Sequence, residues 1–196
     1  MQILLKNLLT EVEAANAEKV PHQIQIYCDM DGVLVDMDQG FRKLSGGVSV
    51  DEFKNKPEFR GDTKAAQRRF WQLINGTPNF WLDLPPTPDA SILWKFITEN
   101  FKTPAPVVLS AGNGASLISE KTRWIHKHFG PNIKVIISPS GKRKPEFVIE
   151  QPLTTHVLID DTQVNIDAWN NPEKHRIAIL HKDAANTIKQ LKNYID

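Results

Sequence analysis

Five short apolar runs with β-strand character constrain the fold of this chain more than any other feature. Several are continuously apolar rather than alternating, which is typical of strands that are covered on both faces. Helix-like segments lie at 116–129 and 183–194, between and after the later runs. This alternation predicts a doubly wound α/β fold, with helices flanking a parallel sheet. The five runs are Gln23–Cys28, Pro106–Leu109, Ile133–Ile137, His156–Ile159 and Arg176–Leu180.

One stretch after the first run breaks this alternation. Residues 41–85 contain no good strand and are rich in aromatic residues, with Ala66, Phe70 and Ile74 spaced by four as in a helix. We interpret 41–85 as a small helical cap inserted after the first strand, between core segments 21–40 and 86–196. The aromatic residues are also compatible with a segment that packs wholly into the core.

Composition narrows the class of protein. Hydrophobic residues make up 40% and charged residues 24% of the chain, as in ordinary globular proteins, and no run approaches the ~20 apolar residues of a membrane span. The formal net charge of +1 gives no global field for a long nucleic acid. Cys28 is the only cysteine, which fits a reducing compartment, and we expect a cytoplasmic protein.

Residues 1–20 have leucines at helical spacing and predict an amphipathic helix, docked on the body of the protein or, as the weaker alternative, bound to a partner.

Polar side chains follow the strand-like runs at the edge where open parallel sheets bind ligands. A lone Asp-x-Asp is usually a solvated turn, but here one acidic pair follows the first run and a second follows the fourth, which favours a functional site. Asp36 and Asp38 are expected instead to cap or solvate the next helix. The residues after the successive runs are Asp29 and Asp31, then Ser110 and Ala111, then Lys142, Arg143 and Lys144, and finally Asp160, Asp161 and Asn165.

These residue types indicate phosphate chemistry. Carboxylates crowded together raise one another's pKa unless a cation neutralises them, and oxygen ligands without histidine or thiolate suit Mg²⁺. A lysine and a hydroxyl provide the charge and the hydrogen-bond donor that a tetrahedral dianion needs. A carboxylate beside a bound phosphoryl group can attack it and form an aspartyl-phosphate.

Four ordered motifs resemble those of the haloacid dehalogenase (HAD) superfamily. DMDGVLVD, from Asp29 to Asp36, resembles its DxDG[TV] signature, and LSAG, Lys142 or Lys144, and LIDDTQVNID are similar to the other three motifs. The resemblance runs from about Ile24 to His181 and implies a Rossmann-like, HAD-type core. DMDGVLVDMDQGF, PNFWLDLPPTPDA, SEKTRWIHKHFGP and VLIDD further resemble the 5′(3′)-deoxyribonucleotidases. That family's second motif is typically Thr-Ser-Pro, so the SAG sequence here lacks one phosphate-facing hydroxyl.

The resemblance implies a role for each matching residue. Asp29 would be the nucleophile and an Mg²⁺ ligand, and Asp31 would bind Mg²⁺ through its carbonyl and act as general acid and base. By the same resemblance Asp160 would be a metal ligand, Asp161 would support the metal site, and Asn165 would lie behind the ligands. Ser110 and Ala111, together with a lysine, would bind the phosphate. Phe80 and Trp81 would line the substrate pocket. Lys142 fits the spacing from the preceding run and is narrowly preferred over Lys144, which lies nearer the KPEF helix start.

The expected function is Mg²⁺-dependent hydrolysis of nucleoside monophosphates, and the expected substrates are deoxyribonucleotides with a 5′ or 3′ phosphate. The same chemistry on a polynucleotide 3′-phosphate end or a sugar phosphate is the nearest alternative. A non-catalytic phosphate-binding or interaction module is the second. The expected partner is a small phosphomonoester, not a membrane or a long nucleic acid, and a homodimer remains open.

Overall fold

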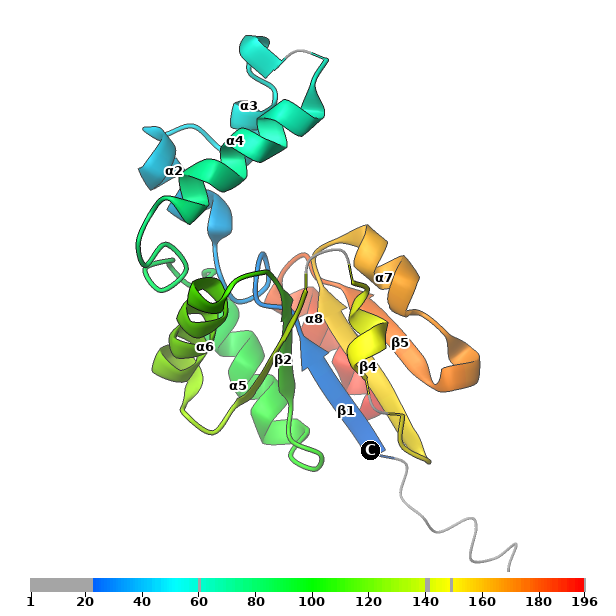
Figure 1. Cartoon of the computed structure of the whole chain (residues 1–196). Helices are drawn as coiled ribbons and strands as arrows, with labels where there is room; N and C mark the ends of the chain where they lie inside the picture. Colours follow the sequence, from blue (N-terminus) through cyan, green and yellow to red (C-terminus); the bar gives the residue numbers. More distant parts are fainter. Residues whose placement is uncertain (1–22, 60, 140–141, 149, 196) are drawn as a thin grey trace, which may run out of the picture.

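A single parallel sheet forms the centre of the molecule. The computed structural model describes residues 23–59, 61–139, 142–148 and 150–195, and within these ranges five strands lie in the order β3-β2-β1-β4-β5 (Figure 1). This confirms the α/β class and the parallel sheet. The helix expected at 1–20 lies outside the described residues. The strands are β1 Gln23–Cys28, β2 Val107–Ala111, β3 Lys134–Ser138, β4 Thr154–Asp160 and β5 Arg176–Leu180.

Helices cover both faces of the sheet (Figure 1). Along β1, Ile26 and Cys28 pack in the main core, whereas Tyr27 between them packs with Trp169 in a second cluster on the other face. This two-sided burial explains why the strands read as continuous apolar runs. The main-core face carries α5 Ala90–Asn100, α6 Ala115–Phe129 and α8 Ala184–Leu191, and the other face carries α7 Gln163–Trp169 and the 3₁₀ turn η2 Lys144–Phe147.

Two of these helices, α5 and α7, lie in segments for which the sequence predicts no element. The seven residues of α7 span only two turns, too few to show a helical period. The predicted C-terminal helix ends at Leu191 and continues as the 3₁₀ turn η4, Lys192–Tyr194. The structure contains no helix among its described residues that is long and apolar enough to cross a bilayer.

A helical unit stands above the carboxyl edge of the sheet (Figure 1). Between β1 and β2 the described residues contain no strand, and the predicted apolar row of Ala66, Phe70 and Ile74 is buried. The Phe41 ring lies 4.9 Å from the Phe70 ring, within a hydrophobic cluster that continues into the main core. The unit, called the cap below, comprises α2 Met37–Ser45, α3 Val50–Lys54, the 3₁₀ turn η1 Pro57–Phe59 and α4 Thr63–Asn75.

The cap begins slightly earlier than the sequence suggests. Asp36 caps α2 by accepting a hydrogen bond from the Gln39 N–H at 2.8 Å, which confirms its expected capping role. The predicted boundary at residue 41 therefore falls inside a helix, and the domain bounds stay a prediction. The two chain crossings between cap and core are paired, because the Asp36 N–H donates to the Pro85 carbonyl at 2.9 Å.

Candidate active site

The first and fourth strands bring two acidic pairs together. β1 and β4 are neighbours in the sheet, and their register pairs Cys28 with Ile159. The Asp29 N–H continues this ladder by donating to the Ile159 carbonyl at 2.8 Å. Chain connections leave in opposite directions at this pair of strands, which is the switch point where open α/β sheets bind ligands.

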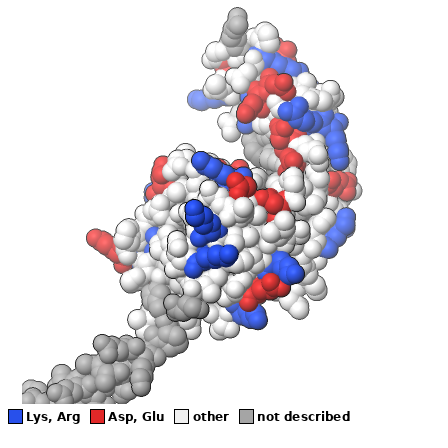
Figure 2. Space-filling model, turned by 180° about the vertical axis from the view of Figure 1, so that it is seen from behind, with Lys and Arg blue, Asp and Glu red and all other residues white. Residues whose placement is uncertain are grey.

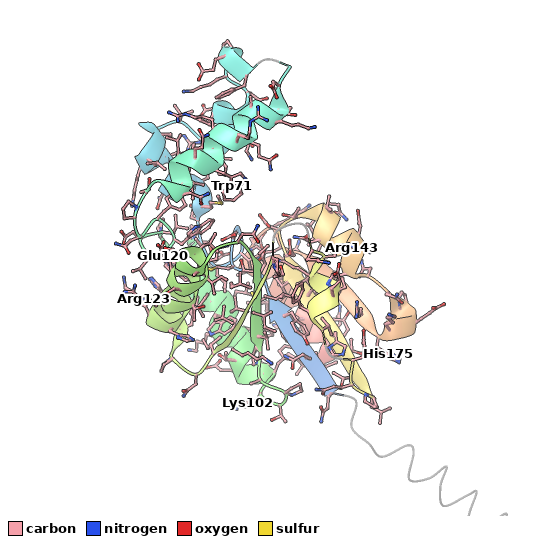
Figure 3. All side chains as sticks on the ribbon, in the orientation of Figure 1. Trp71, Lys102, Glu120, Arg123, Arg143 and His175 are labelled. Atoms are coloured by element: carbon pink, nitrogen blue, oxygen red, sulfur yellow. The ribbon has the colours of Figure 1, made fainter. Side chains whose placement is uncertain are left out.

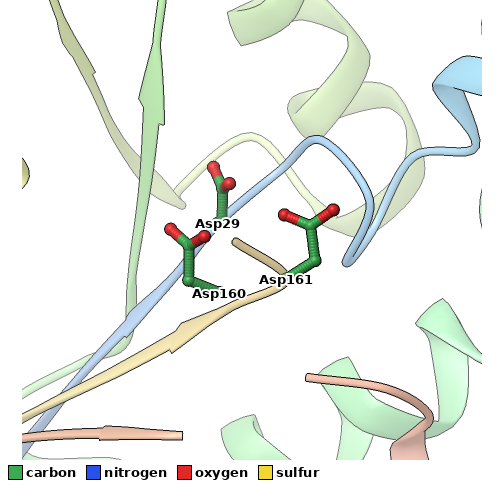
Figure 4. Close-up of side chains that lie close together, drawn as sticks. All are labelled: Asp29, Asp160 and Asp161. Atoms are coloured by element: carbon green, nitrogen blue, oxygen red, sulfur yellow. The ribbon is translucent and has the colours of Figure 1, made fainter. Parts of the chain in front are cut away.

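Three carboxylates converge at this switch point (Figure 4). Asp29, Asp160 and Asp161 each offer one oxygen, and these oxygens lie within 4.8 Å of one another. Asp29 and Asp160 are buried, while Asp161 is exposed. Hard oxygen donors at this spacing fit a divalent cation such as Mg²⁺. The residues present therefore match the cation expected from the sequence.

Lys144, rather than Lys142, lies beside these acids. Its Nζ is 2.9 Å from Asp29 Oδ1 and 2.6 Å from Asp160 Oδ2, and its side chain is only 4% exposed. Lys142 lies outside, 62% exposed and 3.7 Å from Glu146, so the narrow preference for Lys142 is wrong about its position. Spacing along the chain does not reveal the direction of these side chains; the Lys142 N–H donates to the Pro139 carbonyl at 3.0 Å, and it is Lys144, at the start of η2, that reaches the acids.

Asp160 is fixed by several donors. Its Oδ1 accepts from the Thr162 N–H at 2.9 Å and from Asn165 Nδ2 at 3.0 Å. Its Oδ2 accepts from Lys144 and, also at 3.0 Å, from Asn165. Asn165 thus lies behind Asp160, at the position expected from the sequence, and orients a buried carboxylate.

The acids carry more negative charge than one lysine offsets. The pKa of Asp29 is raised to about 7, chiefly by burial; the Lys144 ammonium opposes the rise, and the neighbouring carboxylates of Asp160 and Asp31 add to it. Burial also raises the pKa of Asp161 above its ordinary value, against a hydrogen bond from Thr162. A bound cation would relieve this excess of charge, which is a second reason why the residues fit one.

Gly32 lets the loop after β1 approach Asp161. Its φ of +76° lies in the left-handed region, and a Cβ there would overlap Asp161 Oδ2. The Leu34 and Val35 N–H groups both donate to the Met30 carbonyl at 2.9 Å and close the turn. The glycine of the DMDG sequence is therefore required by both the backbone and the acid cluster.

Asp31 is paired with Lys121, a residue that the sequence-based site did not include. Lys121 Nζ lies 2.5 Å from Asp31 Oδ2 and its side chain is fully buried. One signal was present in the sequence: Lys121 lies four residues after Leu117 and three before Trp124, on the apolar side of the predicted helix 116–129. A lysine at such a position needs a buried partner.

The Ser110 hydroxyl points away from the expected phosphate site. Ser110 is fully buried, and its Oγ accepts a hydrogen bond from Lys121 Nζ at 3.1 Å. Ser110 lies inside β2 rather than after it, so its side chain faces α6. Ala111, whose place at the site was expected, lines the cleft together with Gly112.

A cleft of about 860 Å³ lies between the acids and the cap. Trp71 of α4 is 38% exposed and lies on the side of the cap that faces the sheet edge (Figure 3). Trp81 lines the cleft but is buried, with the Lys121 ammonium 4.0 Å from its ring centre. Phe80 is buried and does not line this cleft: its ring meets the Trp81 ring edge-on, with ring centres 5.3 Å apart, and together with Leu84 it lines a separate, smaller pocket, so it does not lie in its expected place. The lining residues are Asp29, Asp31, Lys144 and Asp161 from the core, Lys54, Trp71 and Asn75 from the cap, and others between them.

Comparison with known proteins identifies the fold. No protein-family model and no curated protein matches the chain. A haloacid dehalogenase-like hydrolase from Burkholderia xenovorans LB400 superimposes with a TM-score of 0.53 at 16% identity, covering 89% of this chain and 99% of that one. A hydrolase from Streptococcus pneumoniae TIGR4 gives 0.48 at 13% identity over 88% and 100% of the two chains. L-2-haloacid dehalogenase from Xanthobacter autotrophicus gives 0.47 at 9% identity over 90% and 92%.

The first of these similarities establishes the class of architecture. This chain has the fold of the haloacid dehalogenase-like hydrolases, a Rossmann-like sheet that the sequence motifs predicted.

Proposed function

We propose that this protein is a Mg²⁺-dependent phosphomonoesterase that hydrolyses nucleoside monophosphates, with deoxyribonucleotides as the first candidates. The observation that carries the proposal is the convergence of buried Asp29 with Asp160 and Asp161, beside Lys144, at an open cleft. A nucleophile, a set of cation ligands and a cationic donor for phosphate thereby meet at one place.

Asp29 is held ready for attack on phosphorus. Its Oδ1 accepts hydrogen bonds from the Met30 N–H at 2.7 Å and from Lys144, which fix the carboxylate in one orientation. In the first step an Asp29 oxygen forms a bond to phosphorus, the ester P–O bond breaks, and the Asp31 carboxyl gives its proton to the departing oxygen. Water then attacks the phosphorus of the aspartyl-phosphate, the P–O bond to Asp29 breaks and restores its carboxylate, the Asp31 carboxylate takes a proton from the water, and inorganic phosphate leaves.

Asp29, Asp160 and Asp161, with the Asp31 carbonyl, would hold the cation. When bound, Mg²⁺ supplies positive charge against the phosphoryl oxygens. Lys144 would bind a phosphoryl oxygen, and in this role its charge stabilises the transition state more than the ground state.

Features of the cleft support a nucleoside as the leaving group. Its volume of about 860 Å³ lies within the range of small-molecule sites. The Trp71 ring is exposed and is supported edge-on by Phe70, with ring centres 5.0 Å apart, so that it offers a face on which a base can stack. Lys and Arg are interspersed with Asp and Glu on the face shown in Figure 2, which supports a small substrate over a long polyanion.

A phosphate-release screen tests the proposal. The substrates are 5′-, 3′- and 2′-nucleotides in deoxy and ribo forms, sugar phosphates and a 3′-phosphorylated oligonucleotide, each with Mg²⁺ and with EDTA. We expect the nucleoside monophosphates to react fastest and chelation to abolish turnover. Release of phosphate from none of them would leave the non-catalytic module, and Mg²⁺-independent release of chloride from 2-chloropropionate would reveal a dehalogenase instead.

Asp29→Asn tests the nucleophile within the same screen. The amide cannot form the aspartyl-phosphate, so we expect turnover to fall by roughly 10³-fold or more while the circular dichroism spectrum is unchanged. Asp83→Asn, an exposed acid outside the cleft, is the matched control and should retain full activity. Near-normal turnover by Asp29→Asn would remove Asp29 as the nucleophile.

A further inference from the structure

Lys121 is a buried cation with a specific set of contacts at the base of the cleft. Besides Asp31 Oδ2 at 2.5 Å, its Nζ contacts Ser110 Oγ at 3.1 Å and the Ala111 carbonyl at 3.0 Å. The fourth contact is the face of the Trp81 ring. Burying an ammonium group costs free energy unless it is paired and hydrogen-bonded, and here the group has three oxygen partners and an aromatic ring.

The arrangement around Asp31 depends on this lysine. Asp31 Oδ2 is bound by Lys121, whereas Asp31 Oδ1 is shielded from solvent and has no hydrogen-bond partner among the described residues. A single side chain therefore anchors the carboxyl group. Without it, both oxygens would lack a partner, and the carboxyl group would rotate toward water to recover hydrogen bonds.

Lys121 also links Asp31 to Trp81, which lies in the stretch that leads from the cap back to the core. Its neighbour Glu120 accepts a hydrogen bond from the Trp81 N–H at 3.2 Å, while Lys121 lies against the Trp81 ring. Two consecutive residues of α6 thus hold both the backbone and the ring of Trp81. Ser110 and Ala111, the other contacts of Lys121, belong to β2. One ammonium group therefore contacts the loop after β1, the sheet and Trp81.

We propose that Lys121 is a positioning residue for proton transfer to the leaving group, acting through Asp31. The proposal rests on the phosphomonoesterase function above. Lys121 is fully buried and does not line the cleft, so it does not touch the substrate. Its role is to hold the Asp31 carboxyl in the orientation from which a proton reaches the departing oxygen.

Two esters of similar size separate this role from a structural one. Benzyl phosphate releases a strongly basic alkoxide, which needs a proton as the P–O bond breaks, whereas p-nitrophenyl phosphate releases a stable phenolate, which does not. The quantity to compare is kcat/KM, because it covers the steps up to the aspartyl-phosphate and excludes its hydrolysis. General structural damage lowers kcat/KM for both esters alike.

In Lys121→Met we expect kcat/KM for benzyl phosphate to fall about 10²-fold or more, and that for p-nitrophenyl phosphate to fall less than about 10-fold. Lys121→Arg, which keeps the charge, should recover most of the benzyl phosphate activity. Lys127→Met, an exposed lysine on the same helix, is the control and should leave both values unchanged. Equal losses on the two esters in Lys121→Met would overturn the proposal.

A double-mutant cycle tests whether Lys121 works through Asp31. In an Asp31→Asn background, Lys121→Met should cause no further loss on benzyl phosphate. A further loss of the same size would show an independent role and overturn the proposal. If Lys121→Met does not fold, Lys121→Gln, which also removes the charge but keeps a polar group, takes its place: a larger loss on benzyl phosphate than on p-nitrophenyl phosphate supports the proposal, and equal losses overturn it. Failure of the unaltered protein to hydrolyse either ester would instead contradict the proposed function.

Discussion

At the scale of single residues, the acid cluster depends on a glycine that contributes no side chain. Gly32 combines a positive φ with a close approach to Asp161. Gly46 provides a comparison, because its φ of +75° is nearly the same but a Cβ there would meet nothing within 4 Å. Comparing alanine variants at the two positions therefore separates the effect of backbone strain from the effect of displacing a cation ligand.

Gly32→Ala should therefore lower activity, and Gly46→Ala should not. Both variants force a non-glycine residue into the left-handed region, at a cost of roughly 1–2 kcal/mol in the free energy of unfolding. Only the Gly32 variant also displaces the Asp161 carboxylate, so we expect at least a roughly 10-fold weaker Mg²⁺ affinity and a matching loss of phosphate release. Mg²⁺ titration with a thermal-shift readout checks this, and equal Mg²⁺ affinity in the two variants would contradict it.

The residues of the site were predictable to different degrees. Asp29 and Asp161 directly follow β1 and β4, and Asp160 is the last residue of β4; strand ends in a parallel sheet meet at one edge whatever the loops do. The lysines depend on loop geometry, which leaves the Lys142 side chain outside and brings that of Lys144 to the acids. Lys121 depends on how α6 docks against the sheet, which local patterns do not specify.

At the scale of elements, α4 carries the cap's contribution to the cleft. Its buried face packs within the cap, and Trp71 lies on the other side, toward the acids (Figure 3).

The strands were predicted within a few residues because burial on both faces makes them apolar throughout. Phe80 and Trp81 were predicted less well: only Trp81 lines the cleft, and the sequence pattern does not say which of two adjacent aromatic residues does so.

Trp71→Ala should weaken binding of nucleotides without affecting small sugar phosphates. Loss of base stacking on an aromatic ring costs about 1–3 kcal/mol, so KM for a nucleoside monophosphate should rise by roughly 5- to 150-fold. KM for ribose 5-phosphate, which has no base, should change little. Ile92→Ala, an exposed apolar residue of α5 outside the cleft, is the control. Equal changes in KM for both substrates would argue against stacking on Trp71.

At the scale of the whole molecule, the acid cluster links folding stability to pH and to the cation. The pKa of Asp29 rises from 3.8 to about 7 on folding. Between these two values the folded state binds more protons than the unfolded state, so the stability contributed by protonated Asp29 is fully present below about pH 4 and is lost as the pH rises through 7. The shift of about 3 pKa units sets an upper limit on the order of 4 kcal/mol for this loss.

A divalent cation should compensate for this loss, because it binds the carboxylate form that is otherwise unfavourable. We therefore expect the increase in Tm caused by Mg²⁺ to be larger at about pH 8 than at about pH 5, where protons compete for Asp29. In Asp29→Asn the main competing proton site is absent, so most of this pH dependence should disappear while Asp160 and Asp161 still give a smaller increase. Thermal unfolding with EDTA or excess MgCl₂ measures both increments. An Mg²⁺ increment in the unaltered protein that is equal at the two pH values would mean that the cation does not bind Asp29, and the nucleophile would then lie outside the metal cluster.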